Sequence, residues 1–190
     1  MNLLIVGLGN PGKEYKHTRH NVGKDFIDIL AVRYGIKLKK EKKLQGFYGK
    51  AQTFDSTLHL LKPDHYMNES GIAVYKAINF LNILIDQILI VHDDLDLPFG
   101  NLRFKEMGGH GGHNGLRNII DHLKGESTFK RLRIGIGHPG KEKNVTKYVL
   151  TKPSSKERDL LEINMKHSLE SIDLVIQSEW QEAMLKLHTT

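Results

Sequence analysis

The chain has 190 residues, no cysteine and a formal net charge of +6. This length suits one domain over residues 1–190, and the lack of cysteine excludes disulfides, thiol catalysis and thiolate metal sites. The modest positive charge favours a polyanionic partner such as nucleic acid without requiring one. No apolar stretch is long enough to cross a bilayer, and the amino terminus lacks the pattern of a signal peptide, so we expect a cytoplasmic protein with no membrane partner.

The first third of the sequence predicts a strand, a long loop and a helix. The predicted strand is Asn2–Val6. The next six residues, GLGNPG, match the dinucleotide-binding fingerprint in letters, but that fingerprint needs a helix that opens within the loop. Helical periodicity starts only at Val22, so we reject the match and interpret Asn21 as the N-cap of that helix. The lysines between residues 37 and 43 are interpreted as a solvated loop.

The middle of the sequence contains the pattern on which a site depends. Two strands, over residues 47–54 and 58–61, precede a polar loop and a helix from about residue 69. The apolar run Ile88–Val91 then predicts a strand buried on both faces. Acidic residues follow at its carboxyl end, where open α/β sheets build their sites. The glycine-rich run Gly108–Gly115 leads directly into another helix.

The last third predicts short strands at residues 102–105 and 131–137 and a polar segment, 138–152, that we expect to be mobile with a helical turn near Tyr148. Ser154 and Glu157 form a capping box that opens one terminal helix. The alternation of strands and helices predicts the α/β class. We expect a single-domain three-layer sandwich, with a mixed, mostly parallel twisted sheet and helices on both faces.

Three of the predicted loops each carry an asparagine, at positions 10, 68 and 114. A single loop asparagine is more often a turn or cap residue. Three carboxamides together can hold a peptide backbone without regard to its side chains, or polarise a carbonyl group. His20 and Asp93 are the candidate base and its orienting carboxylate. The alternative for His20 is a loop histidine bonded to backbone, and the alternative for Asp93 is a turn residue at the end of a strand.

A metal site is a further alternative. The spacings His17-x-x-His20 and His110-x-x-His113 suggest imidazole ligands, with Asp93, Asp94 or Asp96 as another. Neither pair lies on a predicted helix with the glutamate that zinc proteases use. There is also no G-x-S-x-G motif for a nucleophilic serine. We therefore expect neither a metal nor a cofactor.

Six motifs, in order along the chain, resemble those of bacterial peptidyl-tRNA hydrolases. The resemblance runs from Met1 to about Pro153. The six motifs are GLGNPG at residues 7–12 with Tyr15, TRHNVG at 18–23, YMNESG at 66–71, HDDLDLP at 92–98, GGHNGL at 111–116 and RIGIG at 133–137.

The resemblance implies a monomeric, metal-independent α/β enzyme that hydrolyses the ester between a peptide and the terminal ribose of tRNA. Its partner is peptidyl-tRNA. His20 is implied to activate water, Asp93 to support it, and Asn10 to distinguish a blocked amino group from a free one. The residues implied to contact the peptide or the tRNA are Tyr15, Tyr66, Met67, Asn68, Lys105, His113, Asn114 and Arg133.

The main rival is a non-catalytic RNA-binding protein, because plant organelles contain splicing proteins that resemble this family. A metal-dependent hydrolase is the third possibility. All the positions implied to be catalytic carry the matching residues, which favours the enzyme.

Overall fold

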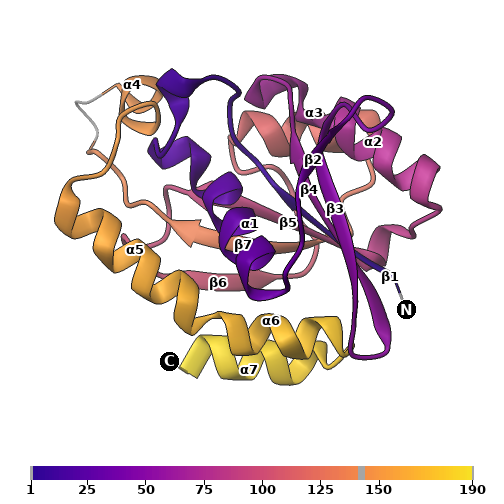
Figure 1. Ribbon diagram of the computed structural model, residues 1–190. Helices are drawn as coiled ribbons and strands as arrows, with labels where there is room; N and C mark the ends of the chain where they lie inside the picture. Colours follow the sequence, from indigo (N-terminus) through magenta and orange to yellow (C-terminus); the bar gives the residue numbers. More distant parts are fainter. Residues whose placement is uncertain (1, 141–143, 190) are drawn as a thin grey trace.

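The structure, a computed structural model, describes residues 2–140 and 144–189 (Figure 1). Its strands are β1 Asn2–Gly7, β2 Lys39–Glu41, β3 Gly46–Thr53, β4 Ser56–Pro63, β5 Ile88–Asp94, β6 Leu102–Lys105 and β7 Lys130–Gly135. They form one sheet in the order β2-β3-β4-β1-β5-β7-β6. Strands β4, β1, β5 and β7 pair in parallel, and the outer pairs are antiparallel. The predicted mixed, mostly parallel sheet is confirmed.

Helices cover both faces of this sheet. The helices are α1 Val22–Arg33, α2 Ser70–Leu81, α3 Asn114–His122, α4 Val145–Val149, α5 Ser155–His167, α6 Leu169–Ile176 and α7 Trp180–Thr189. Alternate residues of β1 point to opposite faces, as the period of a strand requires. Leu3 and Ile5 belong to one core with α1, α5, α6 and α7, whereas Leu4 and Val6 belong to a second core with α2 and α3. The predicted three layers and single α/β domain are confirmed.

Short 3₁₀ turns were not predicted, and two of them lead directly into helices. They are η1 Lys13–Tyr15, η2 Arg19–Asn21, η3 Met67–Glu69 and η4 Ile85–Gln87. Turn η2 leads directly into α1, which lies close against the sheet because two glycines allow backbone contact. A Cβ on Gly7 would lie 2.2 Å from the Gly23 carbonyl oxygen, and one on Gly23 would lie 2.4 Å from that of Val91. This contact holds η2 over the carboxyl ends of β1 and β5.

Two predictions of the sequence are wrong. The lysine-rich segment is not only a solvated loop, since Lys39 and Lys40 form the edge strand β2 against β3. A strand at a sheet edge tolerates exposed lysines, because one side of it faces solvent. The single terminal helix is divided into α5, α6 and α7. Ser168 ends α5 by bonding the Met165 carbonyl with its hydroxyl, and Ser178, at φ 70°, follows α6.

The opposite edge of the sheet, β6, is covered by the end of α7. The Phe104 backbone N–H donates to Nε2 of His188 at 3.0 Å, and Arg103 donates through Nη1 to the His188 carbonyl at 2.7 Å. Trp180 packs against Phe104 with ring centroids 5.0 Å apart. The last helix therefore occupies hydrogen-bonding groups that an edge strand otherwise leaves open.

The predicted mobile segment, 138–152, is described only in part, because residues 141–143 lie outside the described residues. Its mobility stays a prediction. The helical turn expected near Tyr148 is confirmed as α4, and the capping box of Ser154 and Glu157 is confirmed at the start of α5. Within the described residues, no helix is both long and apolar enough to cross a membrane.

Candidate active site

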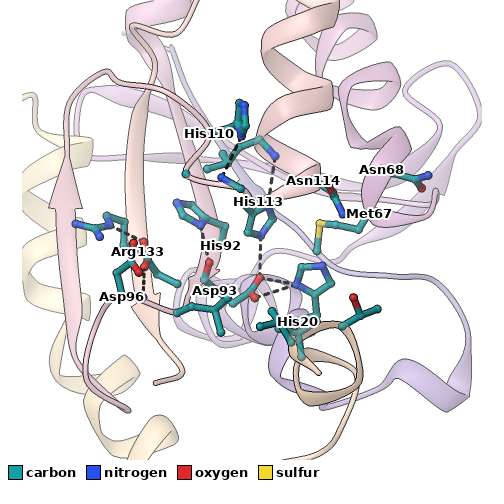
Figure 2. Close-up of a pocket in the computed structure, with 18 of the residues that line it drawn as sticks. His20, Met67, Asn68, His92, Asp93, Asp96, His110, His113, Asn114 and Arg133 are labelled. Carbon is teal, nitrogen blue, oxygen red and sulfur yellow. Dashed lines mark hydrogen bonds and ion pairs between the residues drawn. The ribbon is translucent and has the colours of Figure 1, made fainter. Parts of the chain in front are cut away.

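A cleft of about 670 Å³ opens where the carboxyl end of β5 meets the loops before α2 and α3 (Figure 2). All the predicted site residues except Tyr15 line it. Tyr15 lies beside it, edge-on to Tyr66 with ring centroids 6.2 Å apart. The predicted residues are spread over most of the chain but lie together in the structure. They do so because the carboxyl ends of parallel strands meet at the same edge of a sheet.

His20 and Asp93 are in direct contact. Turn η2 supplies His20 and the end of β5 supplies Asp93, 73 positions later. Nδ1 of His20 lies 2.8 Å from Oδ1 and 2.9 Å from Oδ2 of the carboxylate. The predicted proximity of the two side chains is confirmed, and their catalytic roles stay predictions.

The charges of this pair follow from its surroundings. Burial would raise the pKa of Asp93, but His20 and His113 outweigh it and hold that pKa well below its usual range. Asp93 is therefore ionised. Burial lowers the pKa of His20, yet attraction to Asp93 and the hydrogen bond raise it more, so the pKa of His20 stands above 6.5. A neutral His20 then carries its proton on Nδ1 and leaves Nε2 as the basic nitrogen.

His113 occupies the other side of the same carboxylate. Its Nε2 lies 2.9 Å from Oδ1 of Asp93, and its Nδ1 accepts the backbone N–H groups of Gly115 at 3.1 Å and Leu116 at 3.3 Å. The imidazole thus caps α3 and donates to Asp93. A contact of His113 with substrate stays a prediction, whereas this double role was not foreseen.

Among the described residues, His20, Asp93 and His113 are the one cluster whose side chains could hold a metal ion, because one nitrogen or oxygen atom from each lies within 4.8 Å of the others. A histidine that binds a metal normally donates its other ring N–H to an acceptor. Nδ1 of His113 instead faces two N–H donors. A metal on Nε2 would place an N–H opposite those donors, so this arrangement suits a shared proton better than a metal.

The two histidines of each His-x-x-His pair, raised as an alternative metal site, have different partners. His17 faces Asp25, with Nδ1 3.2 Å from Oδ1, and is about half exposed. His110 accepts the Gly112 backbone N–H on its Nδ1 at 3.0 Å. One histidine of each pair, His20 or His113, therefore contacts Asp93. The other, His17 or His110, bonds a residue near it in the sequence.

Asn10 is held with a fixed orientation. Its Oδ1 accepts the Met67 backbone N–H at 2.7 Å. Asn21 accepts the Asn10 backbone N–H on Oδ1 and donates from Nδ2 to the Asn10 carbonyl, both at 2.9 Å. Asn21 is the N-cap residue of α1, as predicted, but its side chain makes no capping bond and is used on Asn10 instead. With its oxygen occupied, Asn10 offers the cleft only the N–H groups of its amide.

The other two carboxamides differ from Asn10 because they are exposed. Asn68 lies on η3 and Asn114 is the first residue of α3. Neither amide bonds another described residue, so both are open to a ligand. Met67 lies between them and His20 in Figure 2. Its sulfur reaches α3 because position 115 is glycine, where a Cβ would lie 2.6 Å from Sδ.

Cationic side chains gather at one end of the cleft. Lys105 is exposed. Arg133, which the resemblance implies to contact the peptide or the tRNA, pairs through Nε with Oδ2 of Asp94 at 2.7 Å. Arg131 was not predicted. It is 2% exposed and donates to the carbonyls of Gly108 and Gly109, so it holds the glycine-rich loop from behind. The one signal for it in the sequence is its place two residues before Arg133, on the same face of β7.

Arg19, next to His20, was also not predicted. Its guanidinium binds both carboxylate oxygens of Glu157 at 3.1 and 3.2 Å and lies 4.4 Å from the centroid of the Tyr148 ring. It also donates to the Thr151 hydroxyl at 2.8 Å. These contacts tie η2 to α4 and the start of α5, which fixes the backbone that carries His20.

Comparisons with known proteins agree with the resemblance seen in the sequence. The family model described as peptidyl-tRNA hydrolase matches residues 4–190. The peptidyl-tRNA hydrolase of Coxiella burnetii is 50% identical over 186 residues, which cover 98% of this chain and 97% of the relative. That of Alcanivorax borkumensis is 46% identical over 188 residues, which cover 97% and 95%.

A solved structure is similar over the same length. The crystal structure of peptidyl-tRNA hydrolase from Acinetobacter baumannii has a TM-score of 0.93 and 45% identity to this chain. The match covers 97% of this chain and 93% of the other.

Proposed function

Because this chain belongs to the peptidyl-tRNA hydrolase family, we propose that it hydrolyses peptidyl-tRNA with water that His20 activates. The enzyme cuts the ester between the peptide and the terminal ribose of tRNA, and so returns free tRNA to translation. One observation carries the role of His20: its Nδ1 lies 2.8 Å from the buried carboxylate of Asp93. That contact leaves Nε2 free to accept a proton.

In this mechanism His20 takes a proton from water, whose oxygen attacks the ester carbonyl. Asp93 stabilises the imidazolium that forms, because it is ionised and bonded to the opposite nitrogen. As the tetrahedral intermediate collapses, the ribose oxygen leaves with the proton from His20. An ester has a good leaving group, so one base and neutral donors are sufficient without a metal or a covalent nucleophile.

The carboxamides give recognition that does not depend on peptide sequence. Asn68 and Asn114 are exposed and have unused donors and acceptors, which suits contacts with peptide carbonyls and with the attacking water. Asn10 offers only N–H donors, because the Met67 N–H occupies its oxygen. A blocked amino group presents a carbonyl that accepts such a bond, whereas a free ammonium group can only donate. Asn10 therefore favours N-blocked substrates.

The cationic end of the cleft suits the phosphates of tRNA, whose negative charge dominates affinity. Lys105 and Arg133 line that end, and Tyr15 with Tyr66 forms an aromatic edge beside the cleft. The resemblance to this family supports the further proposal that the enzyme is a monomer. Peptidyl-tRNA arises at ribosomes, so we place its action in the cytoplasm.

Replacement of His20 tests the mechanism. We expect His20→Ala to fold normally and to release N-acetylaminoacyl groups from tRNA about 10²- to 10⁴-fold more slowly than the wild type, because general-base catalysis is lost. A rate near that of the wild type would remove His20 from the mechanism. Tight binding of peptidyl-tRNA without turnover in the wild-type protein would instead favour the RNA-binding rival.

The metal-dependent rival is tested separately. Activity that is abolished by a chelator and restored by zinc would favour that rival over water activated by His20. We expect the hydrolysis rate to be unchanged after dialysis against a chelator.

A further inference from the structure

Asp93 receives two imidazoles, and the proposed mechanism uses only one of them. Its side chain is 3% exposed, and Oδ1 lies 2.8 Å from Nδ1 of His20 and 2.9 Å from Nε2 of His113. Figure 2 shows the two rings on either side of the carboxylate, with His113 at the start of α3. A buried carboxylate has few hydrogen-bond partners among which its charge is shared. The bond from His113 therefore changes the strength of the bond from His20.

The start of α3 fixes which nitrogen of His113 carries the proton. Nδ1 accepts two backbone N–H groups, from Gly115 and Leu116, and therefore bears no hydrogen. The proton of the neutral ring is on Nε2, facing Asp93. A second proton on Nδ1 would oppose both N–H groups and the positive end of the helix dipole. His113 thus donates from Nε2 to Asp93 and accepts at Nδ1, whereas His20 must gain and lose a proton in the proposed mechanism.

We propose that His113 is a positioning residue, which holds the Asp93 carboxylate in line with His20 and takes part of its negative charge. The inference rests on the proposed role of His20 but concerns a different side chain. Two donors on one carboxylate restrict its rotation, and this keeps His20 turned with Nε2 toward the cleft. By drawing charge from Asp93, His113 also limits how strongly that carboxylate favours the imidazolium of His20.

The other titratable groups nearby are engaged elsewhere. His92 lies 5.0 Å from His113 between ring centroids, and its Nδ1 donates to the Asp93 carbonyl at 2.8 Å. Asp94 pairs with Arg133, and the guanidinium of Arg19 is turned to Glu157. Among the described residues, His113 is therefore the side chain that shares the Asp93 carboxylate with His20.

The sign of the effect follows from the charge. Without the His113 donor, more of the Asp93 charge acts on His20, and the site is less tightly buried. Both changes favour the imidazolium, so the pKa of His20 should rise. The base is then protonated at a higher pH, and the rate on the acid side falls.

The test replaces His113 with asparagine. Asparagine is among the preferred N-cap residues, so His113→Asn keeps a cap on α3, but its side chain is too short to reach Asp93. The pKa of His20 is measured by following its ring proton in NMR titrations without substrate. The kcat/KM for N-acetylaminoacyl-tRNA is measured over the same pH range. We expect the pKa to rise by about half a unit or more, with about threefold lower kcat/KM on the acid side.

Two controls make the result decisive. His113→Ser, another preferred cap residue, should show the same shift, while thermal unfolding checks that α3 is intact. In an Asp93→Asn background, His113→Asn should leave the pKa of His20 unchanged, because the shared charge is absent. A higher KM with an unchanged pKa would overturn the proposal in favour of a substrate contact. The titration needs no turnover, so it decides this point even if the hydrolysis assay fails.

Discussion

Single side chains in the cleft are fixed by partners that are distant in the sequence. Asn10 shows this most clearly, because Met67 and Asn21 together decide which half of its amide is presented to a ligand. The chemistry of the residue is therefore narrower than that of asparagine in general. Where a free carboxamide both donates and accepts, this one only donates.

Asn10→Ala should reduce the preference for N-blocked over free aminoacyl-tRNA. One hydrogen bond to a buried carbonyl is worth about 1 to 3 kcal/mol, so the ratio of kcat/KM should fall by roughly 5- to 150-fold. Asn10→Asp should go further and favour the free ammonium group, because a carboxylate accepts from it. The two substrates are compared in the same assay. An unchanged ratio in both variants would contradict the role of Asn10.

His92 should make the protein less stable in acid. Burial lowers the pKa of His92 to about 3, so it stays neutral in the folded state while the unfolded chain takes up a proton below pH 6.5. Its contribution to stability is complete above pH 6.5 and is lost as the pH falls toward 3. The loss approaches about 1.4 kcal/mol per pH unit.

This effect is isolated by comparing urea unfolding of the wild type and His92→Leu at pH 7, 6 and 5. The free energy of unfolding should decline less steeply in the variant, by about 1 kcal/mol per pH unit at the acid end. Because His20 and Asp93 are present in both proteins, their contributions largely cancel. Parallel curves would show that His92 does not titrate as inferred.

At the scale of elements, the site depends on contacts that join η2 to the carboxyl-terminal third of the chain. Arg19 is the link, since it binds Glu157 at the start of α5 and packs on Tyr148 of α4. Glu157 also belongs to the capping box with Ser154. One carboxylate thus both starts a helix and holds the turn that carries His20.

Glu157→Gln separates these two roles, because glutamine still completes a capping box but forms no ion pair. We expect the free energy of unfolding to fall by about 1 to 2 kcal/mol, since Arg19 is mostly buried and Glu157 partly so. Hydrogen exchange should increase in α4 and η2. Ser154→Ala, which removes the cap and keeps the carboxylate, is the matched control. Unchanged exchange in η2 would show that the link does not restrain His20.

The elements themselves could be predicted because their signals are local. The apolar run Ile88–Val91, the helical periodicity from Val22 and the capping box at Ser154 each determined an element that the structure contains. The missed elements lack such a signal. Strand β2 is lysine-rich and depends on its pairing with β3. The breaks in the terminal helix occur at the Ser168 hydroxyl bond and at the positive φ of Ser178, which periodicity does not reveal.

The site residues divide in the same way. His20, Asp93 and the three asparagines could be proposed from residue type, loop position and resemblance. Asn21, Arg19 and Arg131 could not, because each acts through a contact with another segment, at separations of 11, 138 and 22 residues. His113 was assigned to substrate, since no feature of the sequence shows that its two nitrogens face a helix start and a carboxylate.

At the scale of the whole molecule, only the positive charge that lies beside the cleft is expected to contact the phosphates of tRNA. The net charge is +6, yet only some of the lysines and arginines line the site. A cation that contacts a phosphate releases counterions, and the salt dependence of binding reports how many do so.

Lys105→Gln should therefore reduce the slope of log affinity for tRNA against log salt concentration by about 1. Lys50→Gln removes the same charge from β3, away from the cleft, and serves as the control. Affinity is measured at several salt concentrations with His20→Ala, so that the substrate persists. Equal slopes for the two variants would indicate that Lys105 does not contact phosphate.

The end of α7 on β6 has a consequence for how these molecules behave in concentrated solution. Unpaired outer strands of two molecules can bond to each other through their backbones and so start fibril formation. Here one border is studded with the ammonium groups of Lys39 and Lys40, while at the other the imidazole of His188 takes up the Phe104 amide. A protonated imidazole cannot accept this hydrogen bond. We therefore expect storage at acidic pH to free the backbone of this outer strand and to make the solution turbid through aggregation before the protein unfolds.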